Sequence, residues 1–142
     1  MKKINIIYWS GTGNTEAMAH AIAEGAKGED NEVKVISVDE AQLSDVEEAD
    51  AVALGCPSMG DEVLEESEME PFVESLQSIN LNKPVGLFGS YGWGNGEWMI
   101  DWEERMEGYG ASLINKGLIV NNDPEDDDIE NCKKLGEMLA SS

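Results

Sequence analysis

The stretch that decides the fold is residues 4–26, which read INIIYWSGTGNTEAMAHAIAEGA. Its first part, Ile4–Trp9, is a short and mostly unbroken apolar run, which is typical of a strand covered on both faces. Its last part, Asn14–Ala26, places apolar residues on one stripe at helical spacing. The sequence therefore predicts a strand, a short loop and a helix, in the order that begins a βαβ unit.

The same alternation continues along the chain. The apolar runs that predict strands are Ile4–Trp9, Val33–Val38, Ala51–Cys56, Pro84–Ser90 and Leu113–Val120. Candidate helices lie between and after them, at Asn14–Ala26, Glu40–Asp50, Val63–Ile79, Trp98–Tyr109 and Glu125–Ala140. Within the third of these, Pro71 predicts that the regular helix begins near it. This pattern in 142 residues predicts an α/β fold, a five-stranded parallel sheet with helices on both faces, as a single domain over residues 1–142.

The chain is strongly acidic. Lysine and arginine number 9 and aspartate and glutamate number 30, which gives a formal net charge of −21. A surface of this charge repels the phosphates of nucleic acids and anionic lipids, so we expect neither nucleic-acid binding nor a membrane role. We expect any protein partner to present a basic face.

The sequence favours a cytoplasmic protein. The apolar run after Lys2 and Lys3 is too short for a signal peptide, and it leads into a glycine-rich loop instead of a cleavage site. No stretch approaches the length of a membrane span. Cys56 and Cys132 have neither metal-type spacing nor the density of a disulfide framework, so we expect both to be buried free thiols.

Ligands of parallel sheets bind at the carboxyl ends of the strands, so the loops there are the candidate site. The first loop reads Ser10-Gly11-Thr12-Gly13-Asn14-Thr15. Its glycines let backbone N–H groups turn inward, and the N-terminus of the following helix adds the positive end of a dipole. It lacks the Gly-Lys of a Walker loop, and Glu16 stands where the dinucleotide fingerprint needs a third glycine. The loop therefore predicts a phosphate site built without lysine or arginine.

The loops after the third and fourth strands are unusual as well. The first of them, Pro57-Ser58-Met59-Gly60-Asp61-Glu62, places a methionine beside a glycine where a peptide plane can rotate. The other, Ser90-Tyr91-Gly92-Trp93-Gly94, holds a tryptophan between glycines. Each alone is a weak signal. At one edge of a sheet, the three loops together predict a pocket for a flat ring that carries a phosphorylated tail.

These residues make the chain resemble the flavodoxins, of the short-chain type found in clostridia and related anaerobes. The resemblance covers essentially the whole chain and rests on three motifs in order, Tyr8–Glu16, Met59–Glu62 and Gly89–Gly94. It implies FMN as a tightly held, non-covalent group, and the strand order 2-1-3-4-5, for which flavodoxin is a standard example. Asn95, where an acid is common, and Pro57, where some members have serine, depart from the pattern without touching the implied chemistry.

The resemblance also implies roles for individual residues. Met59 would pack on one face of the flavin and Trp93 on the other, and Glu62 would meet the N3 side of the ring. Rotation of the Gly60–Asp61 peptide would let the Gly60 carbonyl accept a hydrogen bond from flavin N5–H, which stabilises the neutral semiquinone. The expected FMN-binding residues are Ser10, Gly11, Thr12, Gly13, Asn14, Thr15, Pro57, Ser58, Met59, Gly60, Asp61, Glu62, Ser90, Tyr91, Gly92, Trp93 and Gly94.

The function that the resemblance implies is electron transfer, not catalysis. We expect a monomeric low-potential one-electron carrier, shuttling between semiquinone and hydroquinone among redox enzymes such as reductases and oxidoreductases. One alternative is an FMN-dependent NAD(P)H or quinone oxidoreductase of the same fold, for which 142 residues leave little room. A second alternative, a flavin-binding regulatory or maturation partner, would use the same pocket and stays open.

A run of acids follows the methionine loop. We hypothesise that these acids rim the flavin edge and steer basic partners, although most acidic runs are only solvated surface. The run consists of Asp61, Glu62, Glu65, Glu66, Glu68 and Glu70.

Five further residues have structural interpretations. We expect His20 to be a surface or packing residue, and Arg105 to pair with glutamates of its own helix. Trp98 and Trp102 are predicted to belong to the core. Trp9 lies close enough to the phosphate loop to be a contact there, but packing beside its strand is the interpretation that we favour.

Overall fold

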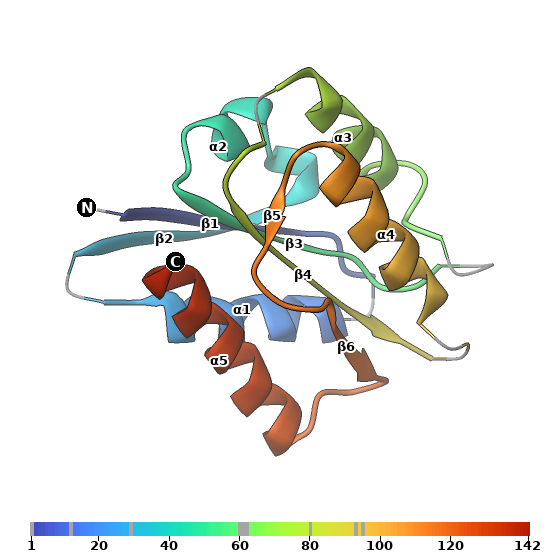
Figure 1. The fold of residues 1–142 in the computed structure, drawn as a ribbon. Helices are drawn as coiled ribbons and strands as arrows, with labels where there is room; N and C mark the ends of the chain where they lie inside the picture. The colour runs from blue at the N-terminus through green and yellow to red at the C-terminus, as the bar shows by residue number, and fades with distance from the viewer. Residues whose placement is uncertain are drawn as a thin grey trace.

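The strands of the computed structural model form one parallel sheet (Figure 1). The structure describes residues 2–11, 13–28, 30–59, 63–79, 81–92, 94 and 96–142. In these ranges the strands are β1 (Lys2–Tyr8), β2 (Asn31–Ser37), β3 (Ala51–Gly55), β4 (Pro84–Tyr91), β5 (Ser112–Leu113) and β6 (Leu118–Asn121). Their order is β2-β1-β3-β4-β5, with β6 also paired to β4, which confirms the expected topology.

The fifth expected strand, Leu113–Val120, is divided into two short strands. Ser112 and Leu113 pair with the start of β4, and residues 118–121 pair with its end. Four residues, 114–117, separate the two strands where β4 has only residues 86–87, so the edge must bulge. The Gly117 N–H points out of the ladder and donates to Glu103 Oε2 at 2.7 Å. Among the described residues the sheet therefore has six strands instead of five.

Helices cover both faces of the sheet (Figure 1). On one face lie α1 (Asn14–Ala26) and α5 (Asp126–Ser141), and on the other lie α2 (Leu43–Glu47), α3 (Met69–Ser75) and α4 (Glu97–Gly108). Short 3-10 turns, Val38–Glu40 and Leu76–Ser78, precede α2 and follow α3. Pro71 lies in the first turn of α3, where its missing N–H costs no helical hydrogen bond. No helix within the described ranges has the length and apolar character needed to cross a membrane.

Two hydrophobic cores follow from the alternation of side chains along the strands. Ile4 and Ile6 pack with α1 and α5, whereas Ile7 belongs to the core under α2, α3 and α4. Trp98 and Trp102 are buried in that second core, as predicted. The buried thiols of Cys56 and Cys132 are both free, which confirms the expectation from their spacing.

The helices α1 and α5 touch backbone to backbone. A Cβ atom at Gly25 would lie 1.9 Å from the carbonyl oxygen of Lys133, and one at Gly136 would lie 2.0 Å from that of Ile22. Only glycine permits this approach, because a methyl group would overlap the facing carbonyl. The contact holds α1 against the C-terminal helix and so fixes the direction in which the N-terminus of α1 points.

Candidate functional site

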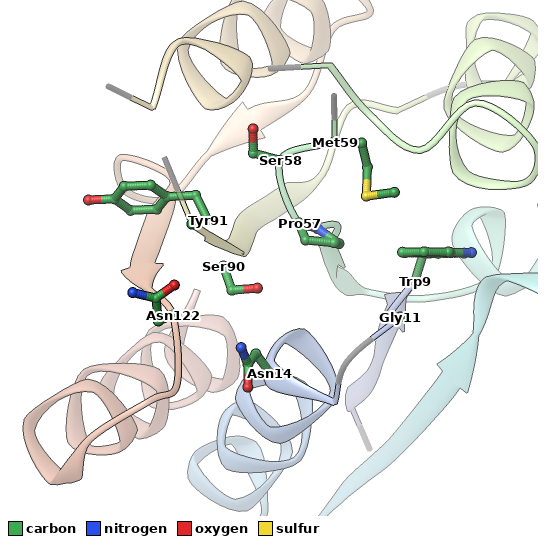
Figure 2. Close-up of a pocket in the computed structure, with 10 residues that line it drawn as sticks. Trp9, Gly11, Asn14, Pro57, Ser58, Met59, Ser90, Tyr91 and Asn122 are labelled. Atoms are coloured by element: carbon green, nitrogen blue, oxygen red, sulfur yellow. The ribbon is translucent and has the colours of Figure 1, made fainter. Parts of the chain in front are cut away.

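A pocket of about 270 Å³ opens at the carboxyl ends of the strands, where the sequence places its three unusual loops. Figure 2 shows Trp9 and Met59 at one side of it and Tyr91 and Asn122 at the other, with Ser90 and Asn14 between them. No charged residue is among the described residues that line it. They are Trp9, Gly11, Asn14, Pro57, Ser58, Met59, Ser90, Tyr91, Gly92 and Asn122.

The loop after β1 delivers the N-terminus of α1 to this pocket. Gly13 has φ +96°, a left-handed conformation that favours glycine, and its N–H donates to Ser10 Oγ at 3.0 Å. The first N–H groups of a helix have no partner within the helix, and among the described residues no side-chain cap is found at the N-terminus of α1. Since Gly11 and Asn14 line the pocket, these donors and the positive end of the helix dipole favour an anion there.

The expected residues of this loop divide into two groups. Gly11 and Asn14 line the pocket, whereas Ser10, Gly13 and Thr15 are not among its lining residues and hydrogen-bond to other residues of the site. Thr15 is buried, and its Oγ1 lies 3.1 Å from the hydroxyl oxygen of Ser90 on β4. This contact joins the loop after β1 to the loop after β4. Thr12 is outside the described residues.

Short contacts also hold the second and third loops together. The Ser58 N–H donates to the Ser90 carbonyl oxygen at 3.0 Å. One residue earlier, a Cβ atom at Gly89 would lie 2.1 Å from the Cys56 carbonyl oxygen, so only glycine fits between β4 and the start of the second loop. The buried Trp98 also contacts the start of the second loop, since its Nε1 donates to the same Cys56 carbonyl oxygen at 3.2 Å.

The two described residues that flank residues 60–62 pair with each other. Met59 and Val63 exchange two backbone hydrogen bonds, of 2.9 and 3.0 Å, across residues 60–62. The Glu65 N–H then donates to Cys56 Sγ at 3.3 Å, which brings the chain back beside its starting point. Burial raises the pKa of the Cys56 thiol to about 12, so it stays protonated. The predictions for Gly60, Asp61 and Glu62 fall outside the described residues.

The loop after β4 contributes the opposite side. Tyr91 and Gly92 line the pocket, and the Tyr91 ring packs on Trp98 with the ring centroids 5.7 Å apart. Gly94 has φ +92° and is not among the lining residues. The prediction for Trp93 falls outside the described residues.

Two lining residues, Trp9 and Asn122, are missing from the sequence-predicted set. Trp9 follows β1 directly and faces the pocket, which agrees with the alternative interpretation of Trp9 as a contact at the first loop and not with the favoured one of strand packing alone. Asn122 follows β6 with φ +58°, and its N–H donates to the Tyr91 carbonyl oxygen at 2.8 Å. The sequence signal for Asn122 is the Asn121-Asn122 pair at the carboxyl end of the last strand, which lies at the same edge of the sheet as the other loops.

The acidic run after the methionine loop is only partly a free surface. Glu65 is 7% exposed, and its carboxylate accepts hydrogen bonds from the N–H groups of Ser67, Glu68 and Met69 at 2.7, 2.7 and 3.0 Å. Burial opposes ionisation of Glu65, but these hydrogen bonds outweigh it and hold its pKa below the ordinary value. Glu65 therefore caps the start of α3, and its side chain is not part of the exposed acidic surface.

Arg105 also differs from expectation. Its guanidinium makes two hydrogen bonds with the Glu70 carboxylate, of 2.8 and 2.5 Å, and a third with the Tyr109 hydroxyl at 2.8 Å. The ion pair therefore joins α4 to α3 instead of staying within α4, and it removes Glu70 from the set of free acids. His20 is exposed, 3.7 Å from Glu16 of the same helix, and does not line the pocket, as expected.

The donor set of the pocket fits FMN. Backbone N–H groups and uncharged side chains around Asn14 suit a phosphate, and no methyl group at Gly11 or Gly13 obstructs them. The apolar surfaces of Trp9, Met59 and Tyr91 suit a flat ring.

Comparison with known proteins agrees with this geometry. The family model described as Flavodoxin matches residues 6–136. The flavodoxin of Clostridium beijerinckii is 47% identical over 138 residues, which are 97% of this chain and 99% of that protein. The solution structure of two-electron reduced Megasphaera elsdenii flavodoxin superposes with a TM-score of 0.89 at 47% identity and covers 98% of this chain and 99% of that one. The oxidised flavodoxin 1 of Bacillus cereus also gives a TM-score of 0.89, at 32% identity, over 99% and 98% of the two chains. The chain therefore belongs to the flavodoxin family, whose members are FMN-binding electron carriers rather than enzymes.

Proposed function

We propose that the pocket at the carboxyl ends of β1, β3, β4 and β6 holds FMN, and that the chain uses it to carry single electrons at low potential between redox enzymes. The observation that carries this proposal is the meeting of an uncharged donor set, at the N-terminus of α1, with the apolar side chains of Trp9, Met59 and Tyr91 in one pocket. The oxidoreductase alternative is not favoured, since the relatives matched over their whole length are named flavodoxin.

In this proposal the residues of the first loop, 10–15, hold the phosphate, and residues 57–62 and 90–94 enclose the ring. Bound FMN supplies the electron-accepting ring system. The resemblance supports Met59 and Trp93 as the residues that cover its two faces, and the Gly60 carbonyl as a hydrogen-bond acceptor toward N5–H. The backbone hydrogen bonds between Met59 and Val63 support this assignment, because these two residues flank the segment that carries Gly60.

The charge of the chain supports a low potential. A phosphate bound without a cation and a net charge of −21 both oppose the addition of negative charge to a flavin in the pocket, which lowers its reduction potential. One unit charge ~12 Å away, at an effective dielectric of about 20, opposes it by about 1.4 kcal/mol. Salt and solvent weaken the contribution of exposed carboxylates.

As a member of this family, the chain exchanges electrons with redox partners. We propose partners with basic faces, such as reductases and oxidoreductases, drawn to exposed acids that include Glu66 and Glu68. The same acidity opposes binding to nucleic acids and membranes. We further propose that residues 1–142 form one FMN-binding domain that works as a cytoplasmic monomer. The two buried free thiols are compatible with a reducing compartment.

Stepwise anaerobic reduction of the FMN-loaded protein tests the electron-transfer role. We expect dithionite to produce the one-electron-reduced flavin as a distinct absorbance intermediate, and NADPH alone to produce no reduction. Direct two-electron bleaching by NADPH, without that intermediate, would contradict the proposal and support the oxidoreductase alternative.

The phosphate assignment is tested by comparing FMN with riboflavin, which lacks the phosphate. Gly13→Ala strains the loop at φ +96°, so we expect it to weaken FMN binding much more than riboflavin binding. Gly110→Ala is the matched control, because Gly110 has φ +99°, has equally open surroundings and does not line the pocket. Equal loss of both ligands in Gly13→Ala would show that the loop does not hold the phosphate.

A further inference from the structure

The indole of Trp9 is held from outside the pocket. Its Nε1 donates to Glu68 Oε1 at 3.1 Å, across 59 positions of the chain. In Figure 2 the nitrogen points away from the other labelled side chains, while the carbon end of the ring lies beside Met59. The polar atom is therefore satisfied behind the wall, and the apolar part of the ring faces the pocket.

A second contact fixes the other side of the Trp9 ring. A Cβ atom at Gly11 would lie 3.0 Å from Cη2 and 3.2 Å from Cζ3 of the indole. The six-membered ring thus rests directly on the backbone of the phosphate loop. With Gly11 against its benzene edge and Glu68 on its nitrogen, the indole has both ends located.

Glu68 is itself placed by the start of α3. Its backbone N–H donates to Glu65 Oε2 at 2.7 Å, and the Glu65 carboxylate is buried at the helix N-terminus. Glu68 is exposed, so its charge could attract a partner without any contact to Trp9. The hydrogen bond to Trp9 is therefore a separate feature of this side chain. A chain of contacts therefore connects the start of α3 to the phosphate loop. It runs from Glu65 to Glu68, from Glu68 to Trp9, and from Trp9 to Gly11.

We propose that Trp9 is a wall of the FMN site in contact with the cofactor, and that Glu68 is a positioning residue that sets the plane of the Trp9 indole through the Nε1–Oε1 hydrogen bond. This inference rests on the proposed function, because it takes the pocket to be the FMN site. It assigns Glu68 a role as a hydrogen-bond acceptor that is separate from its charge.

Substitutions at Glu68 separate these two roles. Glu68→Gln keeps an acceptor for the indole and removes the charge, whereas Glu68→Ala removes both. We expect Glu68→Ala to weaken FMN binding about tenfold and Glu68→Gln to stay within about twofold of the unmodified protein, measured by quenching of FMN fluorescence. Glu66→Ala, which removes an exposed charge from the same segment, is the matched control and should leave the affinity unchanged.

A double-mutant cycle tests whether Glu68 acts through Trp9. Trp9→Phe keeps an aromatic ring but loses the N–H donor, so in its background Glu68→Ala should cause no further loss of FMN affinity. The indole N–H resonance of Trp9, identified by its absence in Trp9→Phe, gives a readout that does not depend on electron transfer. We expect Glu68→Ala to shift this resonance, with and without FMN, and Glu68→Gln to preserve it.

Three results would overturn the inference. Equal losses in Glu68→Gln and Glu68→Ala would mean that charge decides, and independent effects in the double variant would mean that Glu68 does not act through Trp9. An unchanged Trp9 resonance in Glu68→Ala would mean that the hydrogen bond does not set the ring. Failure of the proposed function is distinguishable, because the unmodified protein would then bind no FMN while the resonance still reports the Trp9–Glu68 contact.

Discussion

Replacing Glu65 by alanine should destabilise the protein far more than replacing its neighbour in the acidic run. Glu65 is 7% exposed as a residue, and its carboxylate accepts three backbone hydrogen bonds at the start of α3. Hydrogen bonds to a charged group contribute about 1.5–3 kcal/mol each. Two of the three donors belong to exposed residues, Ser67 and Glu68, and can bond to water in the variant. We therefore expect Glu65→Ala to lower the free energy of unfolding by about 2–3 kcal/mol, at or above the upper end of the range for helix caps.

The effect should also depend on pH in a defined direction. The folded protein holds the Glu65 pKa below its value in the unfolded chain, so the unfolded state binds the proton more readily. The stabilisation is then fully present above the unfolded pKa, near the ordinary value of 4.5, and is lost as the pH falls through the folded pKa. The difference in stability between the unmodified protein and Glu65→Ala should therefore shrink below about pH 4.5.

Urea unfolding with a fixed excess of FMN measures these differences. The FMN dissociation constant of each variant is needed as well, so that the contribution of bound ligand can be subtracted. Glu66→Ala is the control, because Glu66 is exposed and should change stability by less than about 0.5 kcal/mol. If Glu65→Ala behaves like Glu66→Ala at pH 7, or if its effect grows as the pH falls, the assignment of Glu65 as a helix cap is refuted.

Three further predictions concern packing and burial. Gly136→Ala should lower the free energy of unfolding by about 2 kcal/mol in urea titrations, because its methyl group would overlap a carbonyl of α1. The control Gly108→Ala, with open surroundings, should be neutral or slightly stabilising. Equal effects of the two substitutions would contradict the close contact. The Cys56 thiol should not react with a thiol reagent at pH 7 in the folded protein, since burial raises its pKa to about 12. Rapid labelling of the native protein would show that the structure around Cys56 opens. Arg105→Ala should lower the free energy of unfolding by about 1 kcal/mol, because its ion pair with Glu70 is only partly shielded from solvent. A double-mutant cycle with Glu70→Gln should assign most of that loss to the ion pair, and additive effects of the two substitutions would argue against it.

The sequence predicts most of the site because its signals are local. Glycines that alternate with polar residues at 10–15 predict a phosphate loop without knowledge of any distant contact. The rule that ligands bind at the carboxyl ends of parallel strands then brings Met59 and Tyr91 to the same edge. The split of the last strand was less accessible, since it depends on a two-residue difference in spacing between β4 and its neighbours.

Contacts between distant segments account for the remaining differences. The sequence leaves two interpretations of Trp9 open, strand packing and a contact at the first loop, and its hydrogen bond to Glu68, 59 positions along the chain, is visible only in the structure. Arg105 has glutamates on its own helix, but the packing of α3 on α4 offers Glu70 in a two-bond geometry. Glu65 stands in a uniform run of acids, and only its burial distinguishes it from Glu66. These pairings depend on tertiary packing, which charge patterns alone do not encode.

The contact between Gly25 and Gly136 makes the two positions evolutionarily dependent on each other. A methyl group at either site forces α1 and α5 apart, and once the helices have separated, a methyl group at the other site meets less resistance. The first substitution is therefore costly and the second cheap, which is the signature of positive epistasis. Lineages of this fold are expected to cross that barrier rarely and then to change both positions. The same separation would tilt the N-terminus of α1, so ligand affinity is expected to drift together with this remote pair.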